Sequence, residues 1–252
     1  MNIKFINGNG IKLLAAVLML IDHIGMFFFP AAAWLRCIGR ISLPLFAYML
    51  SEGCRYTKNK LAHIALLAVS AAVCQAVYYI VNGTLEMCIL VTFTLSTLNI
   101  YAMQHFKRCA LSDEGGVRVA SSGCMFICMV FLTLYLNSID NVFGVPFRIE
   151  YGFWGCMLPA FASAFDFYKM DAGALAALDC HAARLACFFA GMFMLALTHH
   201  IFRGNLLQWF SLLAVIPLMC YNGSRGRLNL KYFFYIFYPA HISLFYIISC
   251  LI

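Results

Sequence analysis

Residues 13–29 read LLAAVLMLIDHIGMFFF, an apolar run with Asp22 and His23 in its middle. The run begins at Ile11 and is long enough to cross a lipid bilayer as a helix. A carboxyl group and an imidazole are costly at that depth unless they face a polar or hydrated interior. The stretch therefore predicts a membrane-spanning helix that carries two candidates for chemistry.

The composition extends this prediction to the whole chain. Hydrophobic residues make up 64% of the sequence and charged residues 11%, whereas a soluble domain is roughly a quarter charged. We therefore expect one membrane-embedded domain over residues 1–252. The net charge of +7 is spread over short loops, which argues against nucleic-acid binding. Most of the twelve cysteines lie in apolar runs without a CxxC motif, so we expect free buried thiols.

Apolar segments of spanning length recur along the chain and predict an all-α fold, a polytopic integral membrane helix bundle of about nine transmembrane helices. The segments lie at 11–29, 36–52, 61–81, 86–106, 119–137, 151–168, 184–201, 205–221 and 231–251. The segment 36–52 is the least regular, because Arg36, Arg40 and Pro44 interrupt it.

The distribution of Lys and Arg predicts the orientation. With the N-terminus in the cytoplasm, thirteen basic residues face the cytoplasm: Lys4, Lys12, Arg55, Lys58, Lys60, Lys107, Arg108, Arg118, Lys169, Arg184, Arg225, Arg227 and Lys231. Four face the outside: Arg36, Arg40, Arg148 and Arg203. The positive-inside rule favours this arrangement, which also places the C-terminus outside.

His23 is the candidate general base. An imidazole that titrates near neutrality accepts a proton from an attacking hydroxyl or amine, and the neighbouring carboxylate of Asp22 would orient the ring. The alternative is a structural polar pair that holds helices together. The sequence leaves that alternative open, although ionisable residues within membranes are usually functional.

Two further groups are predicted at a similar depth. His23 is about 18 Å along the first helix from its cytoplasmic end, and His241 is about 15 Å along the last one. Arg40 enters from the outer side, where it would hold an anionic group or stabilise an oxyanion, or simply snorkel to the interface. His241 follows Pro239, which frees a backbone carbonyl near the ring.

The loop YNGSRGRLNLK, residues 221–231, is a candidate phosphate-binding loop. Arg225 and Lys231 supply positive charge, and Gly226 allows close approach of a ligand to the backbone. Arg55 and Lys58 at the end of another segment offer similar charge. A basic loop that merely obeys the positive-inside rule is the alternative. The sequence contains no motif for zinc or serine hydrolysis, and we expect no metal.

The chain resembles the TraX family. The resemblance rests on LIDHIGMFF (20–28), GRISLPLFAYMLSEGCRYTKNK (39–60), FTL (93–95), YGFWG (151–155) and YNGSRGRLNLKYFFYIFYPAHI (221–242). TraX is named for acetylating the N-terminus of conjugative pilin, and the family resembles acyltransferase-3 and heparan-α-glucosaminide N-acetyltransferase-like membrane enzymes. One departure is Glu150, where the family commonly has aspartate before Tyr-Gly.

The resemblance implies a membrane-bound acyltransferase of the cell inner membrane. It would move an acetyl group from cytoplasmic acetyl-CoA to an amine or hydroxyl acceptor, which is left open between a peptide N-terminus, a sugar, a lipid and a small molecule. The family motif positions are His23 and Asp22 as the catalytic pair, with Arg40, Arg55, Arg225, Lys231, Tyr238 and His241. A proton-coupled transporter of a small solute is the competing hypothesis, although the sequence shows no inverted repeat.

Overall fold

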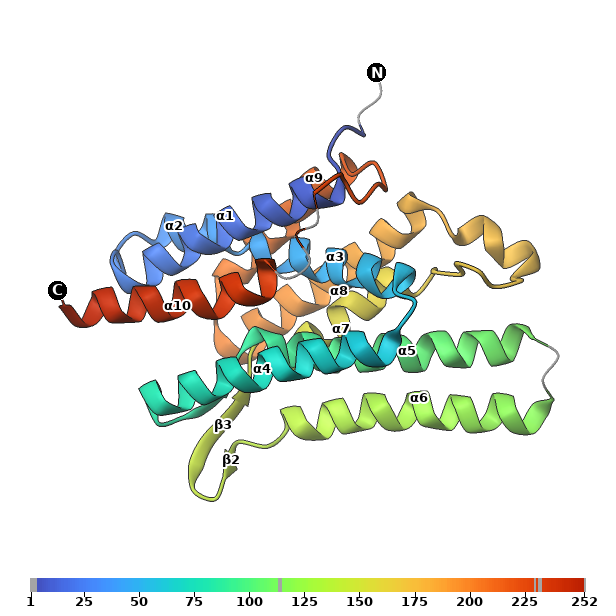
Figure 1. The fold of residues 1–252 in the computed structure, drawn as a ribbon, viewed down its shortest axis with the longest axis horizontal. Coiled ribbons are helices and arrows are strands. Elements are labelled where there is room, and N and C mark those ends of the chain that lie inside the picture. The colour runs from blue at the N-terminus through green and yellow to red at the C-terminus, as the bar shows by residue number, and fades with distance from the viewer. Residues whose placement is uncertain (1–3, 113–114, 229, 231–232, 252) are drawn as a thin grey trace. The chain divides into compact units, whose positions relative to one another are not determined.

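Helices form in each of the nine apolar segments of this computed structural model, which describes residues 4–112, 115–228, 230 and 233–251 (Figure 1). The α-helices are α1 (Gly8–Phe27), α2 (Ala33–Gly39), α3 (Ser42–Tyr56), α4 (Lys60–Asn82), α5 (Ile89–Leu111), α6 (Gly116–Asn137), α7 (Gly152–Ser163), α8 (His181–Arg203), α9 (Val215–Met219) and α10 (Phe233–Leu251). Two 3₁₀ helices, η1 (Gly173–Leu178) and η2 (Leu206–Ala214), join them.

Four of the described helices are long and apolar enough to cross a membrane: α1, α4 over Lys60–Ile80, α6 and α8. Their exposed faces are apolar, as with Val69 and Ile80 on α4 and Phe131 on α6. Large apolar side chains gather on an outer helix surface where lipid rather than water surrounds it. The chain is therefore a helical membrane protein. Nine spans and a cytoplasmic N-terminus stay predictions.

Two predicted segments are less regular than single long helices. The segment 36–52 is divided into α2 and α3 by a turn at Arg40–Ile41, and Pro44 lies in the first turn of α3, where a missing N–H is tolerated. The hydroxyl of Ser42 donates to the carbonyl of Ala15 at 2.7 Å. The segment 205–221 forms η2 and then α9.

A small sheet departs from the all-α expectation. Strands β1 (Leu85–Met87), β2 (Asn141–Val142) and β3 (Val145–Ile149) lie in the order β1-β3-β2. β1 pairs with β3 in parallel, and β2 pairs with β3 antiparallel. The hairpin turn contains Phe143 and Gly144, both with positive φ, as tight hairpins require. The strands are too short for their periodicity to stand out in the sequence.

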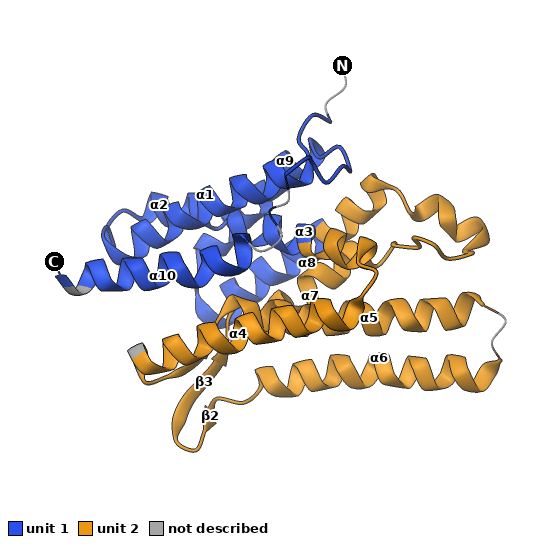
Figure 2. Cartoon of the chain, in the orientation of Figure 1, with its two compact units in different colours: residues 1–49, 189–252 blue, residues 50–188 orange. Residues whose placement is uncertain are grey.

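The chain divides into two compact units, which Figure 2 shows in different colours. One unit contains residues 1–49 and 189–252, and the other contains residues 50–188. The first buries side chains such as Ile11, Leu45 and Leu218 completely. The second contains a cluster around Ile100 and Tyr101 and another around Leu95, Ile149 and Cys156. The predicted single domain stays a prediction.

Candidate active site

The first turn of α1 is held by the loop that was predicted to bind phosphate. The backbone N–H of Gly8 donates to the carbonyl of Ser224 at 2.7 Å, and that of Asn9 donates to the carbonyl of Arg225 at 3.0 Å. The side-chain amide of Asn9 donates to the carbonyl of Leu228 at 2.7 Å. These carbonyls accept hydrogen bonds from N–H groups that a helix N-terminus otherwise leaves unpaired. The N–H groups of Gly8 and Asn9 are therefore not available to a phosphate.

Gly226 allows close approach, but to the chain itself rather than to a ligand. Its φ is +89°, and a Cβ there would lie 2.9 Å from atoms of both Asn7 and Asn9. The structure explains this glycine by its contact with the two asparagines, and a ligand at the Gly226 backbone stays a prediction. The side chain of Arg225 is exposed, and its positive charge repels that of Lys12. Lys231 lies outside the described residues.

Replacing Gly226 with Ala should loosen this loop. A left-handed backbone costs a residue with a Cβ about 1–2 kcal/mol, and the contacts with the two asparagines add to that cost. Gly223→Ala is the matched control, because its φ is +77° but nothing lies within 4 Å of its added Cβ. We expect a lower Tm in detergent for Gly226→Ala than for Gly223→Ala. Equal Tm values would contradict the packing of the loop on α1.

Two imidazoles from opposite ends of the chain meet between α1 and α10. Nδ1 of His23 lies 3.2 Å from Nε2 of His241, and the ring centroids are 4.9 Å apart in an edge-on arrangement. Nδ1 of His23 also lies 2.9 Å from the carbonyl oxygen of Met19. Nδ1 of His241 lies 2.7 Å from the carbonyl oxygen of Phe237. Each ring is thus fixed by a carbonyl of its own helix.

These contacts assign the protons of the neutral pair. A carbonyl oxygen only accepts, so each Nδ1 carries a hydrogen and donates it. Nε2 of His241 then accepts from the Nδ1–H of His23. Nε2 of His23 keeps its lone pair and makes no hydrogen bond to the described part of the chain. Nε2 of His23 is therefore available to accept a proton, whereas His241 contacts the other ring nitrogen, Nδ1.

Aromatic side chains surround the histidine pair. The ring of Phe237 stacks on His241 at 4.9 Å, and Phe245 lies edge-on at 5.9 Å. Tyr238, a predicted site residue, is buried beside His241 with 5.6 Å between ring centroids. The faces of these rings favour a nearby cation. They also keep water away from the pair.

Asp22 faces α2 rather than His23. Its Oδ1 lies 3.5 Å from Nε of Arg36 and 4.0 Å from Nε of Arg40. Neighbouring helix positions point about 100° apart, so the two side chains separate. The predicted role of Asp22 in orienting His23 is not found here, because Met19 and His241 orient that ring. Asp22 instead holds two guanidinium groups beside the base.

A glycine makes this approach of α1 and α2 feasible. A Cβ on Gly39 would collide with the Cβ of Asp22. Gly39→Ala should therefore push the two helices apart and cost about 1–3 kcal/mol. Gly53→Ala is the control, since nothing lies within 4 Å of its added Cβ and Ala favours a helix. Thermal unfolding in detergent should show a lower Tm for Gly39→Ala only. A Tm that is unchanged by Gly39→Ala would contradict this packing.

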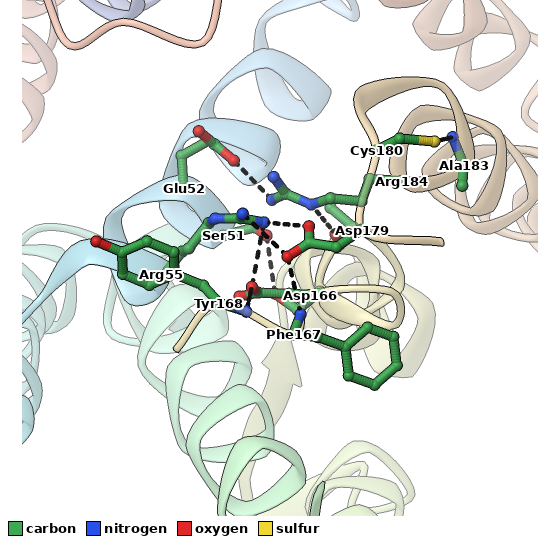
Figure 3. A network of polar contacts seen from close by, with 12 residues as sticks. Ser51, Glu52, Arg55, Asp166, Phe167, Tyr168, Asp179, Cys180, Ala183 and Arg184 are labelled. Carbon is green, nitrogen blue, oxygen red and sulfur yellow. Dashed lines mark hydrogen bonds and ion pairs between the residues drawn. The ribbon is translucent and has the colours of Figure 1, made fainter. Parts of the chain in front are cut away.

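Arg55 is bound by carboxylates of its own chain. Its guanidinium donates to both oxygens of Asp179 at 2.6 and 3.0 Å and lies 3.1 Å from Oδ1 of Asp166 (Figure 3). The rings of Tyr56 and Tyr168 lie within 5.7 Å of the cation. Burial lowers the pKa of Arg55, but these two carboxylates raise it further, so the group stays charged. The prediction that Arg55 binds a phosphate does not fit this saturated geometry.

The same network contains a second buried ion pair. Nη2 of Arg184 lies 2.6 Å from Oε1 of Glu52, with both side chains less than a tenth exposed. Nε of Arg184 donates to the carbonyl of Ala162 at 3.1 Å. Lys107 donates to the carbonyls of Ser163 and Ala164 at the end of α7.

The network is electrically balanced. Burial lowers the pKa of Lys107 to about 8, although the negative charges of Asp166 and Asp179 act to raise it. With Lys107 protonated, three positive and three negative groups meet in this network. They are Arg55, Lys107, Arg184, Glu52, Asp166 and Asp179. The cluster therefore supports a structural role in joining α3, α7 and α8, because the charges of these six described residues cancel.

Comparison with known proteins identifies the family. Residues 7–249 match the family described as TraX protein. The chain belongs to the TraX family. It is also 27% identical over 249 residues to the probable fimbrial assembly protein FimC, serogroup H1, of Dichelobacter nodosus, which covers 93% of this chain and 92% of that protein. No solved structure is significantly similar to the chain.

The TraX motif positions fall into separate groups in the structure. His23, Tyr238 and His241 lie together, with Asp22 and Arg40 beside the first of them. Lys58 is exposed in the turn after α3. Their catalytic and binding roles stay predictions.

Sequence reasoning missed Arg36, which pairs with Asp22, and the acidic partners of Arg55. Arg36 is four residues before Arg40, which places both on one helix face. That spacing was the available signal. Asp166 and Asp179 are more than a hundred residues from Arg55, so no sequence spacing indicated that they pair with it.

Proposed function

We propose that this membrane protein transfers an acetyl group from acetyl-CoA to an amine or hydroxyl acceptor, with His23 as the general base. The observation that carries the proposal is the imidazole pair, in which the 3.2 Å contact leaves Nε2 of His23 free to accept a proton. The resemblance to TraX, which is named for acetylating the N-terminus of pilin, implies the same reaction class.

The proposed reaction has two steps at one nitrogen. Nε2 of His23 removes a proton as the acceptor nitrogen or oxygen attacks the thioester carbonyl. The tetrahedral intermediate collapses, the carbon–sulfur bond breaks, and His23 returns the proton to the leaving thiolate. While His23 is positive, its Nδ1–H donates to Met19 and His241. A hydrogen bond from a charged group is stronger than one from a neutral group, which favours the charged intermediate.

The arginines beside Asp22 are proposed to stabilise the oxyanion. Two guanidinium groups and one carboxylate leave one net positive charge. A fixed positive charge with little surrounding water stabilises negative charge that develops in the transition state. In this proposal Arg40 keeps its predicted role, Arg36 joins it, and Asp22 positions both arginines.

The donor phosphates are proposed to bind on the side predicted to face the cytoplasm. The positive-inside rule assigns Arg225 and Lys58 to that side, and each has an exposed side chain. Lys231 stays a candidate from the sequence alone. Arg55 is left out, because two carboxylates already neutralise it. We also propose that the protein spans the cell inner membrane several times and has its C-terminus outside.

The acceptor class that we propose first is a peptide N-terminus. The relative in Dichelobacter nodosus is named a probable fimbrial assembly protein, and the resemblance to TraX implies acetylation of pilin, so both favour a subunit of a protein fibre. Sugars, lipids and small molecules remain alternative acceptors of the same chemistry.

The test is acetyl transfer by the purified protein in lipid nanodiscs. Acetyl-CoA with a labelled acetyl group is supplied with a pilin-type peptide, and both released thiol and labelled peptide are measured. We expect both products with a free N-terminus and neither with the same peptide blocked at its N-terminus. Solute flux into liposomes without thiol release would favour a proton-coupled transporter instead.

A further inference from the structure

Two buried cysteines share one small region at the junction of α4, β1 and α5. Cys74 lies on α4, and Cys88 precedes the first residue of α5. Their exposed fractions are 1% and 2%. Buried cysteines usually act as small apolar side chains, so burial alone does not set this pair apart.

Hydrogen bonds fix Cys88 over the face of α4 that carries Cys74. The side chain of Gln75 accepts from the backbone N–H of Cys88 at 3.0 Å and donates to the carbonyl of Glu86 at 3.2 Å. Sγ of Cys88 lies 4.0 Å from the carbonyl oxygen of Ala71. Residues three apart on a helix share a face, so Ala71 and Cys74 line the same side. Cys74 therefore lies on the face of α4 against which Cys88 is held, with the two side chains within reach of each other.

The predicted orientation places this junction at an oxidising surface. The turn between the segments 61–81 and 86–106 faces outward when the N-terminus is in the cytoplasm. Disulfides form outside the cytoplasm, whereas the cytosol keeps thiols reduced. We propose that Cys74 and Cys88 form a disulfide bond in the cell, which ties α4 to the start of α5.

The reaction needs an oxidant of the thiol–disulfide exchange class. One cysteine thiolate attacks the disulfide of the oxidant and forms a mixed disulfide. The second thiolate attacks this bond, so that the Cys74–Cys88 bond forms and the oxidant leaves as a dithiol. Two protons and two electrons pass to the oxidant. Because both sulfur atoms are buried in the folded chain, exchange takes place before the α4–α5 turn packs.

Differential alkylation of the unmodified protein tests the bond. Cells are quenched in acid, and free thiols are alkylated with a light maleimide under denaturing conditions. The protein is then reduced and alkylated with a heavy maleimide, and its peptides are read by mass spectrometry. Cys156 is the matched control, because it is fully buried and its described side-chain contact is with Asn137.

We expect heavy label on Cys74 and Cys88 in most molecules and light label on Cys156. Light label on all three would overturn the proposal. In Cys88→Ala, Cys74 should change from heavy to light label. Heavy label that persists on Cys74 in that variant would assign it another partner and also overturn the proposal. None of these outcomes depends on acetyl transfer.

Discussion

His23→Gln should lower the rate of acetyl transfer by about 10²–10⁴-fold, the usual contribution of a positioned general base. Glutamine keeps a polar side chain of similar length but has no lone pair that accepts a proton near neutral pH. Its amide can still donate toward Met19 or His241, so the packing of α1 on α10 is disturbed little. The measurement is the single-turnover rate of labelled acetyl transfer in nanodiscs.

His241 should matter less than His23. His241→Ala removes the acceptor at 3.2 Å but leaves the Met19 carbonyl at 2.9 Å. A hydrogen bond to a charged group is worth about 1.5–3 kcal/mol, which corresponds to a loss of about 10- to 100-fold. His200→Gln is the control and should leave the rate unchanged, because His200 is exposed on α8 beside Trp209. An active His23→Gln protein would refute the role of His23 as the base.

Arg184→Ala should lower the free energy of unfolding by about 3–5 kcal/mol, because it removes the opposite charge that faces the buried carboxylate of Glu52. Both side chains are less than a tenth exposed, and the pair is 2.6 Å apart. Glu52→Ala should have a similar effect for the same reason. The measurement is equilibrium unfolding in mixed detergent micelles.

The double variant Glu52→Leu, Arg184→Leu distinguishes the cost of an unpaired buried charge from the cost of altered packing. Apolar replacement of both members of a buried pair is often close to neutral, so it should cost much less than either single change. The exposed pair Glu86–Arg148, at 3.7 Å and more than half exposed, is the matched control. Glu86→Ala should cost about 0–1 kcal/mol. Equal losses for Arg184→Ala and Glu86→Ala would contradict the buried network.

The helical segments could be predicted from the sequence because each described α-helix overlaps one of the nine long apolar runs. The break at Arg40–Ile41 and the 3₁₀ geometry of η2 could not, because both depend on local backbone bonds within an apolar segment. The sheet was missed for a related reason. β2 has two residues and β1 has three, which is too few for an alternating pattern to be recognised.

The residues of the candidate site could be proposed from the sequence, but their contacts could not. His23 and His241 each stand out as polar groups in apolar helices, and their depths matched. Their 3.2 Å contact joins positions 218 residues apart, which no spacing rule reaches. For Asp22, closeness in the sequence did not produce the expected contact. Its closeness to His23 in sequence suggested a pair, while the helical rotation directs it to Arg36 and Arg40.

The most direct test of the account is transfer of labelled acetyl from acetyl-CoA to a free peptide N-terminus by the purified protein and by His23→Gln. We predict labelled peptide and an equal amount of released thiol for the unmodified protein, and a loss of both for the variant. Thiol release and peptide labelling at the same rate in both proteins would contradict the account.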